Sequence, residues 1–191
     1  MTVDITAFAA RPTAIDGLFL ITMKQVIDER GTVREFYRES SFVDAGLPAL
    51  GPFLQINATE THLGGLRGLH AEDMVKLVAV VAGEAFGAYV DLRPDSATRG
   101  AVVTTVLVPG TQVLVPKGVG NGFQVTGHGP AQYLYGFDQE WVPGMAGVAC
   151  GPLDPALGIE WPLPIDPGDR RMISEKDRDA PRFADLPGGD R

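Results

Sequence analysis

The sequence predicts an all-β protein built as an antiparallel β-sandwich or barrel. Short runs of β-branched or alternating residues recur along the chain, and turn residues separate them. The 24 Gly and 15 Pro suit many turns between short strands better than they suit long helices. Segments of this length and spacing are typical of antiparallel sandwiches and barrels.

The expected strands cover most of the first 140 residues. Residues 17–26 form the first run, and a turn follows at residues 28–31. A shorter run spans residues 53–57, and residues 76–82 (KLVAVVA) form the clearest apolar strand. The later expected strands are residues 85–92, 101–107, 112–115 and 132–137. Pro-Gly and Pro-Lys-Gly turns separate several of them.

Helix signals are few, and nothing in the sequence divides the chain into parts. Residues 39–45 and 154–157 each suit about one turn of helix. Residues 164–191 are rich in charge, Pro and Gly, and we expect them to wrap over the surface. Because 191 residues suit one buried core and no repeat or linker interrupts them, we expect a single domain over residues 1–191.

Charge and cysteine usage exclude several classes of protein. The net charge of -8 offers no basic face for a nucleic-acid backbone. Cys150 is the only cysteine, so no internal disulfide can form, and a reducing compartment is the simplest interpretation. Residues 1–12 do not resemble a signal peptide, and no run approaches the ~20 apolar residues of a membrane span. We therefore expect a cytoplasmic protein with no nucleic-acid or membrane partner.

Three histidines, His62, His70 and His128, are the first candidates for chemistry. His70 ends a strand-like run, so it either caps a strand in a polar loop or acts as a general base. A metal site is not expected, because the sequence has no His-x-His pair. Gly64 and Gly65 also interrupt the segment between His62 and His70.

Motifs spread over residues 17–185 occur in the order found in one known family. They are DERG (28–31) with Glu35, FLQIN (53–57), LRGLH (66–70), KLV (76–78) with Gly83-Glu84, VDLR (90–93) with Ser96 and Gly100, VPKG (115–118) with Gly122-Phe123, YLY (133–135), DPALGIEWP (154–162) and SEKD (174–177). Each motif alone is weak, but the ordered set resembles the dTDP-4-dehydrorhamnose 3,5-epimerases.

The resemblance implies a jelly-roll fold of the cupin class, a homodimer, and an isomerase that needs no metal or organic cofactor. The family's enzymes remove the acidic proton next to the C4 ketone of a dTDP-linked 4-keto-6-deoxy sugar. A proton then returns to the opposite face, which inverts C3, C5 or both. This chemistry requires a base, an acid on the other face, and a group that stabilises the enolate oxygen.

Four residues match the family's catalytic positions. The resemblance implies that His70 is the base, that Asp177 holds it, that Tyr135 is the acid and that Lys76 stabilises the enolate. Taken singly, Asp177 suits a surface charge, Tyr135 a core or interface residue, and Lys76 a solvated strand end. All four required residue types are nevertheless present together, which favours the catalytic interpretation.

Further residues match the family's substrate pocket. Arg30 and Arg67 suit the diphosphate, because a guanidinium can bind two oxygens at once. The aromatic ring of Trp141 suits stacking on the nucleotide base, although a core tryptophan is an equal alternative. The remaining predicted substrate-binding residues are Glu35, Gln55, Asn57 and Asn121, the last of which stands where the family has a histidine.

Two departures from the family bear on specificity. His70 and Lys76 are only six residues apart, so the loop between them is shorter than in the family, and Ala71 replaces an aromatic residue. These changes favour altered specificity over lost chemistry, including a C3 or C5 monoepimerase of antibiotic deoxysugar biosynthesis. Two further alternatives are a cupin sugar 3,4-ketoisomerase and a non-catalytic module that binds nucleotide sugars.

Overall fold

The computed structural model describes residues 3–188, which fold mainly as antiparallel strands in two large sheets and one small sheet. The five-stranded sheet has the order β10 (Val102–Leu107), β9 (Ala85–Asp91), β12 (Val119–Val125), β7 (Leu66–Glu72) and β14 (Gly147–Ala149). The six-stranded sheet has the order β2 (Ala9–Pro12), β3 (Phe19–Thr22), β11 (Thr111–Val115), β8 (Lys76–Ala82), β13 (Ala131–Phe137) and β6 (Gln55–Thr61).

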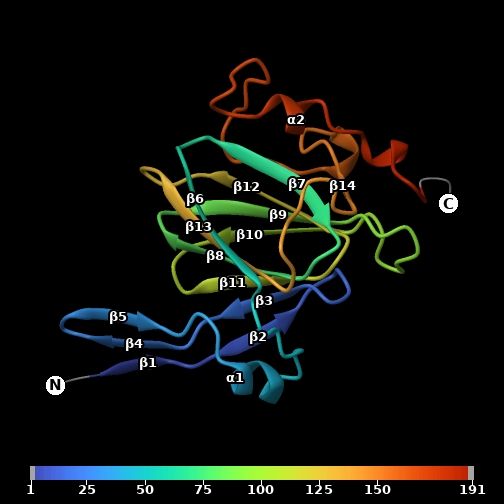
Figure 1. The fold of residues 1–191 in the computed structure, drawn as a ribbon. Helices are drawn as coiled ribbons and strands as arrows, with labels where there is room; N and C mark the ends of the chain where they lie inside the picture. The colour runs from blue at the N-terminus through green and yellow to red at the C-terminus, as the bar shows by residue number, and fades with distance from the viewer. Residues whose placement is uncertain (1–2, 189–191) are drawn as a thin grey trace.

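The main hydrophobic core lies between these two sheets. It combines buried residues of the six-stranded sheet, such as Val80 and Tyr133, with residues of the five-stranded sheet, such as Tyr89 and Phe123. The rings of Phe123 and Tyr133 stack across the core with centroids 4.0 Å apart. The predicted all-β class is confirmed, and the two facing antiparallel sheets form the predicted jelly roll (Figure 1).

A third sheet extends away from this body as a blue arm in Figure 1. It consists of β1 (Asp4–Thr6), β4 (Gln25–Asp28) and β5 (Gly31–Arg34), in the order β1-β4-β5. The single strand predicted over residues 17–26 is therefore wrong. The chain leaves the six-stranded sheet after Thr22 and enters the small sheet at Gln25, because β3 pairs with β2 and β11 whereas β4 pairs with β1 and β5.

Most of the later predicted strands are confirmed to within a residue, as β8, β9, β10, β11 and β13. The run at residues 53–57 begins later than expected and continues as β6 to Thr61. The prediction missed β1, β2, β5, β12 and β14. In β12, Gly120 and Gly122 interrupt the β-branched pattern that marks a strand in a sequence, so only pairing with β7 and β9 defines it.

Short helices cover the outer faces of the sheets. Both predicted helical turns are present, as α1 (Glu39–Asp44) and η1 (Pro155–Leu157). Phe42 of α1 packs with Leu47 and Leu50 against Leu77 and Leu114 of the six-stranded sheet. None of the helices within residues 3–188 has the length and apolar character that crossing a bilayer requires.

The C-terminal segment wraps over the five-stranded sheet, as expected for the described part of residues 164–191. It contains α2 (Glu175–Arg178) and η2 (Phe183–Asp185), and it appears in red above β7 and β14 in Figure 1. Leu186 and Leu157 pack against Leu69 and Val90 of the sheet. Residues 189–191 lie outside the described residues. This packing places α2 beside β7.

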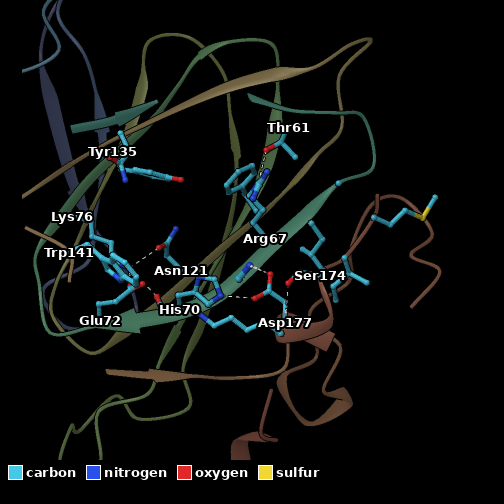
Figure 2. Close-up of a pocket in the computed structure, with 18 of the residues that line it drawn as sticks. Thr61, Arg67, His70, Glu72, Lys76, Asn121, Tyr135, Trp141, Ser174 and Asp177 are labelled. Atoms are coloured by element: carbon cyan, nitrogen blue, oxygen red, sulfur yellow. Dashed lines mark hydrogen bonds and ion pairs between the residues drawn. The ribbon is translucent and has the colours of Figure 1, made fainter. Parts of the chain in front are cut away.

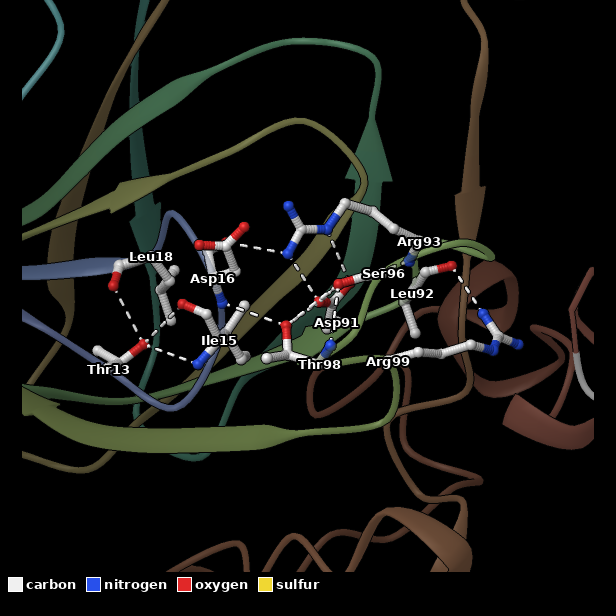
Figure 3. Close-up of polar contacts among 10 residues, drawn as sticks. All are labelled: Thr13, Ile15, Asp16, Leu18, Asp91, Leu92, Arg93, Ser96, Thr98 and Arg99. Carbon is white, nitrogen blue, oxygen red and sulfur yellow. Dashed lines mark hydrogen bonds and ion pairs between the residues drawn. The ribbon is translucent and has the colours of Figure 1, made fainter. Parts of the chain in front are cut away.

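A buried carboxylate fixes the loop after β9 (Figure 3). Asp91 has no solvent exposure, and its side chain accepts hydrogen bonds from Ser96 Oγ and Thr98 Oγ1, both at 2.6 Å. Arg93 donates to both oxygens of the same carboxylate and also to the backbone oxygen of Asp16, at 2.9 Å. The network therefore ties the end of β9 to the N-terminal part of the chain.

Candidate active site

The four predicted catalytic residues line one cavity of about 410 Å³. Lys76 comes from β8 and Tyr135 from β13 in the six-stranded sheet, whereas His70 comes from β7 in the five-stranded sheet. Asp177 lies on α2, in the wrapping C-terminal segment. The fold thus brings together residues that are up to 107 positions apart in the sequence, and Figure 2 shows them around the same space.

An irregularity in β7 places two of its residues on the cavity side. In a regular strand, Arg67 and His70 would point to opposite faces, because side chains alternate. The pairing of β7 with β12 shifts register between Asn121, opposite His70, and Phe123, opposite Arg67. Gly68 has φ +121°, and a Cβ there would lie 2.4 Å from the backbone of β12, so only glycine fits. Both side chains consequently line the cavity.

His70 and Asp177 form a close pair. The Nε2 atom of His70 lies 2.6 Å from Oδ1 of Asp177, and the Gly68 N–H donates to Oδ2 at 3.4 Å. Ser174 begins α2 and accepts a hydrogen bond from the Asp177 N–H at 3.1 Å, which fixes the helix turn that carries the carboxylate. Burial by itself raises the pKa of Asp177, but His70 and the Gly68 and Ser174 contacts together hold that pKa below its ordinary value. Asp177 is therefore a charged partner for His70.

Lys76 places a positive charge deep in the same cavity. Only 4% of the residue is exposed. Its ammonium donates to the backbone oxygen of His70 at 3.1 Å, to the amide oxygen of Asn121 at 3.2 Å and to the carboxylate of Glu72. Burial lowers the pKa of Lys76, and the charge and hydrogen bond of Glu72 oppose that shift. The lysine is thus a buried hydrogen-bond donor aimed at the space beside His70.

Tyr135 lies across the cavity from Asp177, as Figure 2 shows. Its hydroxyl shares a hydrogen bond of 2.6 Å with Thr59 Oγ1 of β6. Its ring packs between those of Tyr133 and Phe137, with centroids 5.3 and 5.4 Å away. The tyrosine is therefore held in one orientation, with a hydroxyl that can carry a proton on the side opposite the His70–Asp177 pair.

Four of the seven predicted substrate-binding residues line the cavity, and three do not. Asn57, Arg67, Asn121 and Trp141 line the cavity, and Arg67 donates from Nε to Thr61 Oγ1 at 2.8 Å. Gln55 stands behind this lining, where its amide contacts the Asn57 side chain and the Trp141 backbone N–H.

Arg30 and Glu35 do not line the cavity of their own chain. Arg30 lies at the tip of the β4–β5 hairpin, with a side chain that is 80% exposed and paired with Asp28. Glu35 follows β5 and pairs with Lys24 and Arg38. The binding roles of these two residues stay predictions.

Several cavity residues escaped the sequence analysis. Glu72 lies two positions after His70 on the same strand, so strand alternation alone would have placed both on one face. Arg170, Arg171, Ser174 and Lys176 also line the cavity. Their approach depends on how the C-terminal segment wraps, for which no local sequence signal exists. These residues add positive groups to the cavity wall beside Arg67, with Arg170 paired to Glu175 and Arg171 paired to Asp169.

Metal ligation has no obvious basis in this cavity. Within residues 3–188, no three or more His, Cys, Asp or Glu side chains gather closely enough to hold a metal ion. The cavity instead offers a histidine–carboxylate pair, a phenol on the other side and a buried ammonium beside the histidine. These are the groups that an enzyme needs in order to move protons at a stereocentre.

The comparisons with known proteins agree with this class. The sequence profile of the family described as dTDP-4-dehydrorhamnose 3,5-epimerase matches residues 12–185. The chain belongs to this family and is an isomerase. A dTDP-4-dehydrorhamnose 3,5-epimerase of Pseudomonas aeruginosa is 35% identical over 178 residues, which cover 90% of this chain and 94% of that protein.

Solved structures of related enzymes share the fold. A 4-keto-6-deoxy sugar epimerase from the novobiocin gene cluster of Streptomyces spheroides superposes with a TM-score of 0.84 at 30% identity, over 96% of this chain and 92% of that one. A 3'-monoepimerase of Streptomyces bikiniensis in complex with dTDP-quinovose gives a TM-score of 0.81 at 29% identity, over 91% and 87% of the two chains. The relatives thus include a 3,5-epimerase, which is named for two centres, and a monoepimerase, which is named for one.

Proposed function

We propose that this enzyme epimerises a dTDP-linked 4-keto-6-deoxyhexose at C3, C5 or both, without a metal or organic cofactor. The observation that carries the proposal is that His70 and Tyr135 reach one cavity from opposite sheets. A base and an acid on opposite sides are what inversion needs, because the proton must leave one face of the ring and return to the other.

Each catalytic group has a role that follows from its contacts. His70 takes the proton next to the ketone, and the charged Asp177 at 2.6 Å stabilises the imidazolium that forms. Lys76 donates to the enolate oxygen, where a hydrogen bond from a buried cation is strong. Tyr135 then returns a proton to the opposite face. Arg67, with Arg170, Arg171 and Lys176, provides positive charge for the diphosphate.

Proton NMR in deuterated water tests the proposal directly. With dTDP-4-keto-6-deoxyglucose as substrate, we expect the H3 signal, the H5 signal or both to disappear as deuterium enters. His70→Ala should abolish this exchange, which controls for uncatalysed exchange. A product with the ketone moved to C3 would instead identify a ketoisomerase. Tight binding without exchange would identify a binding module and contradict the proposal.

Inversion of a single centre is a second candidate, and the loop after His70 favours it. The short connection places Glu72 and Lys76 directly beside His70, and Asn121 contacts Lys76 from β12. These side chains surround the base and restrict how the ring can turn to present its second carbon. The same NMR experiment separates the cases, because a monoepimerase exchanges H3 or H5 but not both.

We also propose that the enzyme is a cytoplasmic homodimer in which Arg30 serves the partner's cavity. Arg30 does not line its own cavity and lies exposed at the tip of the projecting arm, which also exposes apolar Val3, Ile5 and Val33. Light scattering should give twice the chain mass. Arg30→Ala and His70→Ala chains should each be nearly inactive alone, and mixing them should restore about a quarter of the activity, because half the dimers then hold one intact site. Wild-type activity of Arg30→Ala alone, or no gain on mixing, would contradict a role for Arg30 in the partner's cavity.

A further inference from the structure

Glu72 is a second carboxylate in the cavity, and the proposed proton transfers do not use it. Its side chain lines the cavity with 25% exposure, and it forms an ion pair with the nearly fully buried Lys76. Burial by itself raises the pKa of Glu72, but Lys76 and His70 together lower it below its ordinary value. Glu72 is thus an ionised carboxylate beside the group that is to stabilise the enolate.

All three ammonium hydrogens of Lys76 have partners. They point to the His70 backbone oxygen, the Asn121 amide oxygen and the Glu72 carboxylate. Of these partners, only Glu72 carries a charge. An ammonium buried without an opposite charge is costly, and such a lysine tends to lose its proton. Glu72 is therefore the contact that decides whether Lys76 enters the reaction as a cation.

We propose that Glu72 is a positioning residue that keeps Lys76 charged and aimed beside His70, ready for the enolate oxygen. The inference rests on the proposed function, because it gives Lys76 its role in that reaction. When the ketone oxygen arrives, Lys76 gives up the Asn121 amide, since a neutral acceptor binds an ammonium less strongly than a carboxylate does. Glu72 stays in place throughout and carries no proton.

Among the described residues that line the cavity, Glu72 is the only carboxylate in contact with Lys76. The titratable groups that line the same cavity are His70 and Glu72 on β7, Tyr135 on β13, Asp177 on α2, and Arg67, Arg170, Arg171 and Lys176. Asp177 is engaged with His70, Arg170 pairs with Glu175 and Arg171 pairs with Asp169. Arg67 and Lys176 have the same charge as Lys76 and would oppose it. Replacing Glu72 by a neutral residue should therefore lower the pKa of Lys76 further.

The first test observes Lys76 itself and does not depend on activity. The chain has four lysines, Lys24, Lys76, Lys117 and Lys176, so their side-chain carbons can be assigned by NMR and followed with pH. In Glu72→Gln, the Lys76 signal should titrate at a pH at least about one unit lower than in the wild type. The exposed Glu160→Gln is the matched control and should leave it unchanged. An unshifted Lys76 in Glu72→Gln would overturn the proposal.

The second test measures turnover on the sugar substrate. Glu72→Gln should lower kcat roughly 10- to 100-fold with a much smaller change in KM, as expected when an interaction made in the transition state is lost. The alkaline limb of its kcat–pH profile should also move to lower pH, because Lys76 loses its proton at a lower pH than in the wild type. Glu72→Asp, which keeps the charge, should recover most of the rate. If Glu72→Gln does not fold, Glu72→Asp still tests the proposal, because its Lys76 must titrate near the wild-type pH.

A double substitution separates positioning of Lys76 from other effects. In a Lys76→Met background, Glu72→Gln should cost little further activity, since the two residues act as one unit. A full additional loss would show that Glu72 acts independently and would overturn the inference. If the wild type shows no proton exchange at all, the proposed function fails, whereas the lysine titration still decides whether Glu72 holds Lys76 charged.

Discussion

Replacing Asp177 by Asn removes one charge from the proposed proton-transfer pair and changes little else. Asn has nearly the same shape, so the Ser174 contact to the backbone of residue 177 can persist. The hydrogen bond at 2.6 Å to His70 loses its charge, and the amide can rotate so that its NH₂ group faces Nε2. The base would then sit in the wrong tautomer without a partner for its positive form.

The expected loss follows from these contacts. A hydrogen bond to a charged group contributes roughly 1.5–3 kcal/mol. Asp177 is only 5% exposed, so water screens its charge poorly. Together with the tautomer change, kcat should fall by about two to four orders of magnitude, the usual range for an acid–base group. KM should change by less than about threefold, because the carboxylate contacts the base and not the substrate.

The assay is loss of the H3 and H5 signals in deuterated water, run beside Asp179→Asn as a control. Asp179 lies at the end of the same helix, is exposed and pairs with Arg178, so its loss should leave the rate unchanged. Thermal unfolding across pH provides a second check. The pKa of folded Asp177 is lowered, so its stabilisation is present above the unfolded pKa and is lost as pH falls through the folded value. Turnover of Asp177→Asn at the wild-type rate would refute the assigned pair.

Three further predictions concern other parts of the molecule. Tyr135→Phe should bind substrate normally and still exchange the sugar ring proton through His70. It should form little inverted product, which product NMR measures. Arg67→Ala should raise KM about tenfold or more with kcat changed less, because it removes the proposed diphosphate contact, and calorimetry with dTDP should show the same weakening. Asp91→Asn should lower the free energy of unfolding by about 3 kcal/mol at neutral pH, because it strips the charge from a fully buried carboxylate that Arg93, Ser96 and Thr98 hold. Burial by itself raises the pKa of Asp91, but the hydrogen bonds from Arg93, Ser96 and Thr98 hold it at about 2 in the folded protein. The gap in unfolding free energy between variant and wild type should therefore close as pH falls through 4 toward 2, and an unchanged gap would contradict this origin.

The sequence by itself predicted the strands whose signal is local. The apolar run of β8 and the alternating runs of β9, β10, β11 and β13 carry their own pattern, so their bounds were predicted to within a residue. Strand β12 carries no such pattern, because glycines occupy its centre and its conformation depends on its neighbours. The break between β3 and β4 was missed for the same reason, since it depends on which sheet each half joins.

The chemistry was likewise divided between sequence and structure. Residue types and their order singled out His70, Lys76, Tyr135 and Asp177 as candidates through a family resemblance, because an ordered set of motifs can be read from the sequence without any knowledge of contacts. Which side chains share a cavity was decided only by tertiary structure. Wrapping of the C-terminal segment brings Asp177 to His70, and the register shift against β12 turns Arg67 to the same side. Strand alternation and a short loop bring the Glu72 carboxylate to the Lys76 ammonium. That contact matters because Lys76 is buried, and burial is a property of the tertiary structure that the linear sequence does not contain.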